Sequence, residues 1–213
     1  MAGILDILGP ALSGGTLQSL SNTIGTDEQT TQQAMMAALP VILGAMNRNT
    51  NDPQGAQSLA KALEQDHDGS LLDHLGGFLG ALDGAPGSEA ALGVPGVGGR
   101  ATNGTGILRH VFGARLPAVE QGIEKATGLQ RGQVTRMLVA LAPIVMAYLG
   151  RQKRQQNLDP GGLSDLLRQE STTARQAAPN DLLGTISNFL DRDKDGNPLD
   201  DVAGMLGGFL GGR

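Results

Sequence analysis

Two short stretches of the chain carry acidic residues at alternate positions followed by a glycine, a pattern that can bind calcium. Calcium prefers about six to eight oxygen ligands in a flexible loop, and a glycine permits the sharp turn. Crowded carboxylates repel one another, so a bound cation would stabilise such a loop. We therefore predict Ca²⁺ in the second stretch, around the turn at Gly196. Its expected ligands are Asp191, Asp193, Asp195, Asn197, Asp200 and Asp201.

The second stretch departs from a calcium-binding hand at two positions. Such a hand has a bidentate glutamate at about its twelfth position, where this chain has Val202. The eighth position of a hand is normally apolar, and in this chain Pro198 occupies it. Asp200 or Asp201 would have to supply the missing carboxylate. The sequence thus predicts a looser aspartate-rich loop and not a standard pair of hands.

The first stretch matches the same pattern less well, because Glu64 stands where the second stretch has Asp191, and Leu75 takes the place of the closing glutamate. The alternative for both stretches is turn and cap chemistry alone. Asp and Gly favour turns, and an aspartate before a helix binds its free amides. The expected ligands of the first stretch are Glu64, Asp66, Asp68, Ser70 and Asp73.

Catalytic chemistry has no candidate site in the sequence. The chain has no cysteine, which excludes thiolate nucleophiles and thiolate metal sites. The glycine-rich stretches have no phosphate-loop lysine, and no serine or threonine has an evident His and acid partner. His67 and His74 lie near each other, but His67 is in the loop itself, so zinc is not favoured. His110 is expected to be structural. We expect a protein that is not an enzyme.

Charge and hydropathy restrict the partners. The formal net charge is −5 without a dominant basic arm, and phosphate contacts need clustered Lys and Arg, so nucleic acid is not an expected partner. Residues 1–15 lack the charged start and apolar run of a signal peptide. The longest apolar stretch, residues 138–149, is shorter than the ~20 residues that span a bilayer. We expect a cytoplasmic protein with no membrane span.

The two halves of the chain repeat each other. Gly25 and Pro40 are separated by the same number of residues as Gly128 and Pro143, and an apolar run follows each proline. The two aspartate-rich stretches also align, because each has an Asp-x-Asp-Gly core and a further aspartate four residues after the glycine. Self-similarity of this kind indicates a duplication. We predict a first helical unit at 1–81, a Gly/Pro/Ala-rich linker at 82–105 and a second unit at 106–213.

The fold class follows from the spacing and types of the apolar residues. They recur every three or four positions, no segment alternates as a strand does, and aromatics are only 2%. We expect an all-α protein of two small bundles, each with a helix-turn-helix-like corner and an aspartate-rich loop. Pro40 and Pro143 should kink or divide their helices, and 172–179 is a polar interruption. The expected helices are 17–24, 27–47, 53–63, 71–79, 107–112, 116–127, 130–152, 162–169, 180–190 and 199–210.

These motifs resemble those of the YidB-like bacterial proteins, which carry a widespread domain of unknown function. The resemblance implies an all-helical fold with a homeodomain-like three-helix element, and it implies no activity. Shorter members of that group carry the domain once, whereas this chain carries two copies of the motifs. The resembling residues are 25–40, 106–113, 117–120, 128–143 and 191–196.

Three functions stay open on this sequence. The first is a structural or interaction protein that binds calcium, and we expect this one. The second is a DNA-associated protein using the corner at 123–138, with Arg131 and Arg136, although the first-half corner carries Asp27 and Glu28 instead. The third is a ligand-free self-assembly module. Apolar, glycine-rich segments such as 202–210 would dock within the molecule or form a homo-oligomer or a contact with a protein partner.

Overall fold

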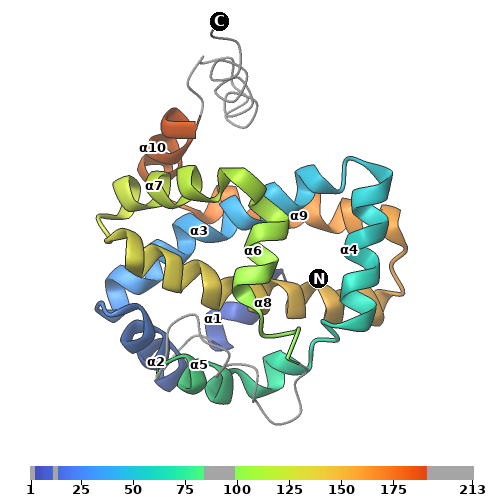
Figure 1. Ribbon diagram of the computed structural model, residues 1–213, viewed down its shortest axis with the longest axis horizontal. Coiled ribbons are helices and arrows are strands. Elements are labelled where there is room, and N and C mark those ends of the chain that lie inside the picture. Colours follow the sequence, from blue (N-terminus) through green and yellow to red (C-terminus); the bar gives the residue numbers. More distant parts are fainter. Residues whose placement is uncertain (1–2, 12–13, 84–98, 191–213) are drawn as a thin grey trace, which may run out of the picture.

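The computed structural model describes residues 3–11, 14–83 and 99–190 (Figure 1). This part of the chain is helical throughout and has no strand, which confirms the all-α fold class. The α-helices are α1 (Ile4–Ala11), α2 (Gly15–Ile24), α3 (Glu28–Asn49), α4 (Pro53–Gln65), α5 (Leu75–Asp83), α6 (Gly104–Phe112), α7 (Leu116–Thr127), α8 (Arg131–Gln156), α9 (Pro160–Ala177) and α10 (Asn180–Leu190), with short 3₁₀ turns η1 (Ser70–His74) and η3 (Gly113–Arg115).

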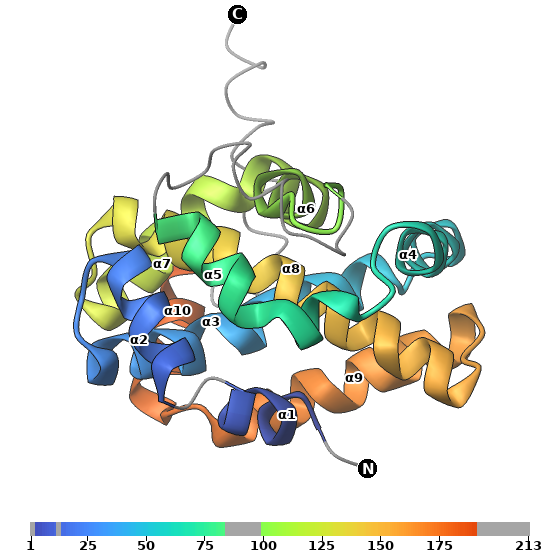
Figure 2. The ribbon, with the colours of Figure 1, turned by 90° about the horizontal axis from the view of Figure 1, so that it is seen from below.

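The two longest helices, α3 and α8, form the centre of the body (Figures 1 and 2). Helix α9 packs along α3, α6 crosses α8, and α4 contacts both α8 and α9. Nearly every residue from Met137 to Gly150 is buried, so α8 is apolar on all sides because it lies inside the core. One cluster of buried side chains includes residues from both halves of the chain. The halves therefore interlock around a shared core.

The corners before α3 and α8 are built alike. Helix α2 ends at Gly25 and α7 at Gly128, both in the left-handed region with φ of 81° and 74°, where a glycine carries no steric cost. Asp27 then caps α3, and Gln130 caps α8 in a capping box. Both helices continue through their internal prolines, so neither is divided.

Several helix bounds differ from those expected, and α1 was not expected at all. Helix α9 runs through Ala177, so the polar interruption predicted at 172–179 is wrong for most of its length. Ser171 and Ala174 are buried, while Thr172 bonds back to the Arg168 carbonyl, so this polar sequence still has one face on the core. Helix α8 is longer than the apolar stretch at 138–149. By length and composition alone it is apolar enough to cross a membrane, but 78% of its apolar window is buried inside the protein, as in an ordinary core helix.

The last helix of each half packs on the first helix of its corner. Helix α5 lies on α2, and α10 lies on α7. The order along the chain differs, however. In the first half the aspartate-rich stretch precedes α5, whereas in the second half α10 precedes residues 191–201. Residues 199–210, where a helix is expected, lie outside the described residues.

Candidate functional site

The first aspartate-rich stretch, residues 64–73, lies against the C-terminal end of α8. Gly69 makes its turn with φ of 90°, as the pattern predicts. On α8, Gly150 faces the loop so closely that a Cβ at this position would collide with the carbonyl oxygen of His67. The loop backbone therefore meets α8 where only a glycine leaves room.

Each acid of this stretch is paired with a different base, and three of the four bases come from the end of α8. Arg151 also donates to the Gly69 carbonyl at 2.9 Å, so it holds both the backbone and a side chain of the loop. The charges of the stretch are thus balanced by the protein itself. The pairs are Glu64–Lys153 at 2.6 Å, Asp73–Arg151 at 2.7 Å, Asp66–Arg100 at 3.8 Å and Asp68–Arg154 at 3.8 Å.

The remaining predicted ligand, Ser70, takes part in turn chemistry. Its amide donates to Asp68 at 2.9 Å, and hydrogen bonds from Ser70 lower the pKa of the Asp68 carboxyl. Within the described ranges, no three His, Asp or Glu side chains come together as a metal-binding group. Calcium in the first stretch stays a prediction without support from this geometry. The second set of expected ligands, at 191–201, lies outside the described residues.

The helix-turn-helix-like corner at α7 and α8 uses its polar residues to hold the first half of the chain. Gln133 donates to the Gly25 carbonyl at 2.6 Å, and Arg136 donates to the Ile24 carbonyl at 3.3 Å, at the C-terminal end of α2. Arg131 pairs with Glu124 at 3.5 Å. These contacts give the corner a packing role, and nothing in them favours the DNA-associated alternative.

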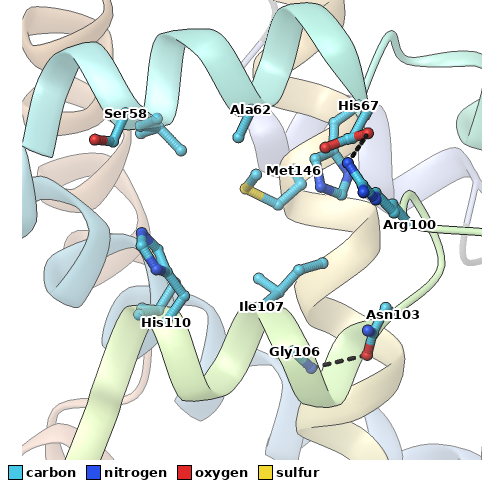
Figure 3. Close-up of a pocket in the computed structure, with 12 residues that line it drawn as sticks. Ser58, Ala62, His67, Arg100, Asn103, Gly106, Ile107, His110 and Met146 are labelled. Atoms are coloured by element: carbon cyan, nitrogen blue, oxygen red, sulfur yellow. Dashed lines mark hydrogen bonds and ion pairs between the residues drawn. The ribbon is translucent and has the colours of Figure 1, made fainter.

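A groove separates α4 from α6, and we call it the α4–α6 groove. Figure 3 shows Ser58 and Ala62 of α4 across from Ile107 and His110 of α6, with Met146 of α8 between the two helices. The part shown has a volume of about 270 Å³. A second part of about 490 Å³ continues it toward the end of α3 and shares four lining residues with the first. The apolar lining consists of Met46, Leu59, Ala62, Ile107, Val111 and Met146.

A buried histidine lines one end of this groove. His67 is 5% exposed, and its Nδ1 has no hydrogen-bond partner. Burial lowers the pKa of His67 from its ordinary value of 6.5, against the opposing effect of Asp66 and Asp68, so the ring is neutral at pH 7. The ion pair of Asp66 and Arg100 lies beside it (Figure 3).

An arginine lines the other end. Arg48 is half-buried, and its Nη1 is inaccessible to water and has no hydrogen-bond partner within the described ranges. Burial, and then the neighbouring Arg115, lower the pKa of Arg48. The two guanidinium groups therefore repel each other at this end, which Asp52 also lines. This end of the groove suits a carboxylate or another anion.

A further buried polar cluster joins α1, α8 and α9. The Tyr148 hydroxyl donates to Glu170 Oε1 at 2.6 Å, and the backbone amide of Ile4 donates to Oε2 at 2.9 Å. Burial, followed by the Glu170 carboxylate, raises the pKa of Tyr148. The carboxylate is 5% exposed and both of its oxygens are bonded, so this cluster holds helices together and leaves no group free for chemistry.

Sequence reasoning missed the α4–α6 groove. Its lining comes from α3, α4, α6 and α8, which no local pattern connects. His67 was considered only for zinc and His110 only as structural, although both line the groove. The one sequence feature that points to the groove is Arg48. It follows Pro40 at the same distance as Arg151 follows Pro143.

Comparison with known proteins gives a family and no activity. The family model described as "Bacterial protein of unknown function (DUF937)" matches residues 6–152. No curated protein and no solved structure matches the chain. The match is one continuous stretch that covers the first half and extends into α8. It therefore does not show two copies of the domain.

Proposed function

Since the chain belongs to this bacterial family of unknown function, which supplies no activity, we propose from its own residues that it is a non-enzymatic structural or interaction protein whose residues 191–201 bind calcium. The observation that supports the proposal is that the end of α8 pairs three bases with the first stretch, whereas the corresponding positions after Pro40 hold only one base. We further propose that the chain is YidB-like and internally duplicated, which the matching corners of α2–α3 and α7–α8 support.

The first stretch receives three bases from the end of α8: Arg151, Lys153 and Arg154. We align the two halves on Pro40 and Pro143. In this alignment the residues of the first half that correspond to the three bases are Arg48, Thr50 and Asn51. The second stretch is therefore offered one base where the first is offered three. A calcium ion would supply the missing positive charge.

The second stretch also carries bases of its own, Arg192 and Lys194, but they do not replace a cation. They alternate with the aspartates, so in an extended loop their side chains point away from the carboxylates. Residues 191–201 contain five acids against these two bases. A net excess of carboxylates on one side of the loop supports a hard cation there.

Close docking of the kind seen at α8 is not available on α3. The counterpart of Gly150 is Asn47, whose side chain would keep a loop backbone at a distance. The end of α3 therefore offers neither the glycine nor the set of three bases that hold the first stretch on α8. Its carboxylates are left for a metal ion.

Thermal unfolding tests the calcium proposal. With calcium at ~100 times its Kd, binding stabilises the folded state by ~2.7 kcal/mol, and for a chain of this size the melting temperature should rise by about 5–10 °C. The double variant Asp193→Ala, Asp195→Ala should abolish this rise because it removes two central carboxylates. The matched control, Asp66→Ala with Asp68→Ala in the first stretch, should keep it. An unchanged wild-type melting temperature in millimolar calcium would contradict the proposal.

A further inference from the structure

Two residues at opposite ends of the same groove each have a buried nitrogen atom without a partner in the described part of the chain. The atoms are His67 Nδ1 and Arg48 Nη1, and both residues line the α4–α6 groove. Buried polar groups in folded proteins are nearly always hydrogen-bonded, because water is lost without replacement. The lining between the two ends is mostly apolar. Such a lining suits an apolar segment with polar ends.

We propose that in the calcium-free protein the α4–α6 groove binds residues 199–210 of the same chain as an amphipathic helix, with Asp200 against Arg48. An amphipathic helix binds such a groove through apolar side chains every three or four residues. The segment has this spacing, with acids at one end. Its apolar residues are Val202, Met205, Leu206, Phe209 and Leu210.

The corresponding segment of the first half supports a helix of this kind. Helix α5 follows the first aspartate-rich stretch and buries its side chains at the same spacing against α2. The buried residues are Leu75, Phe78, Leu79 and Leu82. In the second half, however, α10 already covers α7, the counterpart of α2. Residues 199–210 therefore need a different apolar surface, and the groove offers one.

Charge supports the direction in which the segment lies. Asp73 of the first half pairs with Arg151 of the second half. The counterparts of these two residues are Asp200 and Arg48, and Arg48 has no hydrogen-bond partner for its Nη1 within the described ranges. A carboxylate at this end would also relieve the repulsion between Arg48 and Arg115.

The opposite end of the groove suits the end of a helix. The last carbonyls of a helix have no partner within it and attract cations and N–H donors. Arg100 lies at this end, and a neutral His67 can carry its proton on Nδ1 and donate. The acids of 199–210 then lie at Arg48 and its C-terminal carbonyls lie near Arg100.

The chain is long enough to make this connection. In the calcium-free chain nine residues lie between Leu190 and Asp200, and these ten steps of extended chain reach ~33 Å. Helix α10 packs on α7, which is only ~18 Å long at 1.5 Å per residue. Helix α7 begins directly after Arg115, which lies beside Arg48. Asp200 can therefore reach Arg48 from any point along α7.

Hydrogen exchange of the full chain tests the docking, and EDTA in the buffer makes the result independent of calcium. Arg48→Gln and Leu59→Asp should each speed amide exchange of residues 202–210 about tenfold, because docked amides exchange only when the segment opens. The matched controls are Arg109→Gln on an exposed arginine and Leu158→Asp on a half-buried leucine outside the groove. Equal exchange in variants and controls would overturn the proposal.

A disulfide distinguishes docking within one chain from docking between two. The protein has no cysteine, so an introduced pair forms no other bond. Ser58→Cys with Ala203→Cys should give a cross-linked monomer at micromolar concentration, because a disulfide needs Cα atoms within about 7 Å. Ser19→Cys with Ala203→Cys is the control and should stay reduced. A cross-linked dimer, or no cross-link together with unchanged exchange, would show that the segment does not occupy its own groove.

Discussion

The C-terminal ends of α3 and α8 have corresponding positions in the sequence but make different contacts. The end of α8 offers Gly150 and three bases, and it holds an acidic loop by backbone contact and ion pairs. The end of α3 offers Asn47 and one base, Arg48, which has an unpartnered Nη1 within the described ranges. At the end of α8, the acidic loop therefore has both room for its backbone and charges that balance its own.

Filling the space beside Gly150 should have the largest effect on the free energy of unfolding. Gly150→Ala places a methyl group against the His67 carbonyl oxygen, and backbone on both sides cannot move aside easily. We expect a loss of ~3 kcal/mol in the free energy of unfolding, since overpacking outweighs the ~1 kcal/mol that Ala gains over Gly in a helix. Denaturant unfolding measures it.

The counterpart Asn47→Ala is the control for this change. Asn47 is only half-buried, so its replacement should change stability by less than ~0.5 kcal/mol. Similar losses for both variants would mean that the ends of α3 and α8 do not differ in the way described.

Removing the α8 bases that pair with the loop should have the next largest effect on the free energy of unfolding. Arg151→Gln removes the bond to the Gly69 carbonyl and the pair with Asp73, and we expect a loss of ~1–2 kcal/mol. Lys153→Gln removes one pair with the 61%-exposed Glu64 and should cost below ~0.5 kcal/mol. Chemical denaturation at low and high salt measures both. An Arg151 variant as stable as the Lys153 variant would show that the loop is held by packing alone.

His67 should give a smaller, pH-dependent effect. Its folded-state pKa is lowered, so the unfolded chain takes up a proton first as the pH falls through 6.5. Stability from the neutral, buried ring is present above this pH and is lost as the pH falls below it. Most carboxylates titrate near pH 4, outside this window. His67→Gln should flatten the stability profile between pH 7 and 5, whereas the exposed His110→Gln should not. Identical slopes would contradict a buried, neutral His67.

Local patterns predicted much of the fold. The bounds of α7 and α10 were predicted at their observed residues, because a glycine ends the first and a proline precedes the second. The end of α9 was not, because Thr172, Thr173 and Arg175 look polar in sequence while Ser171 and Ala174 face α3. Packing against a neighbour decided that helix, as tertiary contacts often override propensity.

The candidate sites were predicted less completely. The sequence identified the acidic residues of 64–73 and the turn at Gly69, both of which depend on neighbours a few positions away. It could not identify the bases that pair with them, since Asp73 and Arg151 are 78 positions apart. The α4–α6 groove was missed for the same reason.

The amino-acid sequence alone determined that this protein is helical, where its glycine turns lie, and that it contains two aspartate-rich stretches. These properties come from hydrogen bonds and apolar spacing within about one or two helical turns. The tertiary structure decided that the halves share one core, that α8 neutralises the first loop, and that a groove with an unpartnered end remains between α4 and α6. Such features depend on which distant residues meet, and local periodicity carries no information about that.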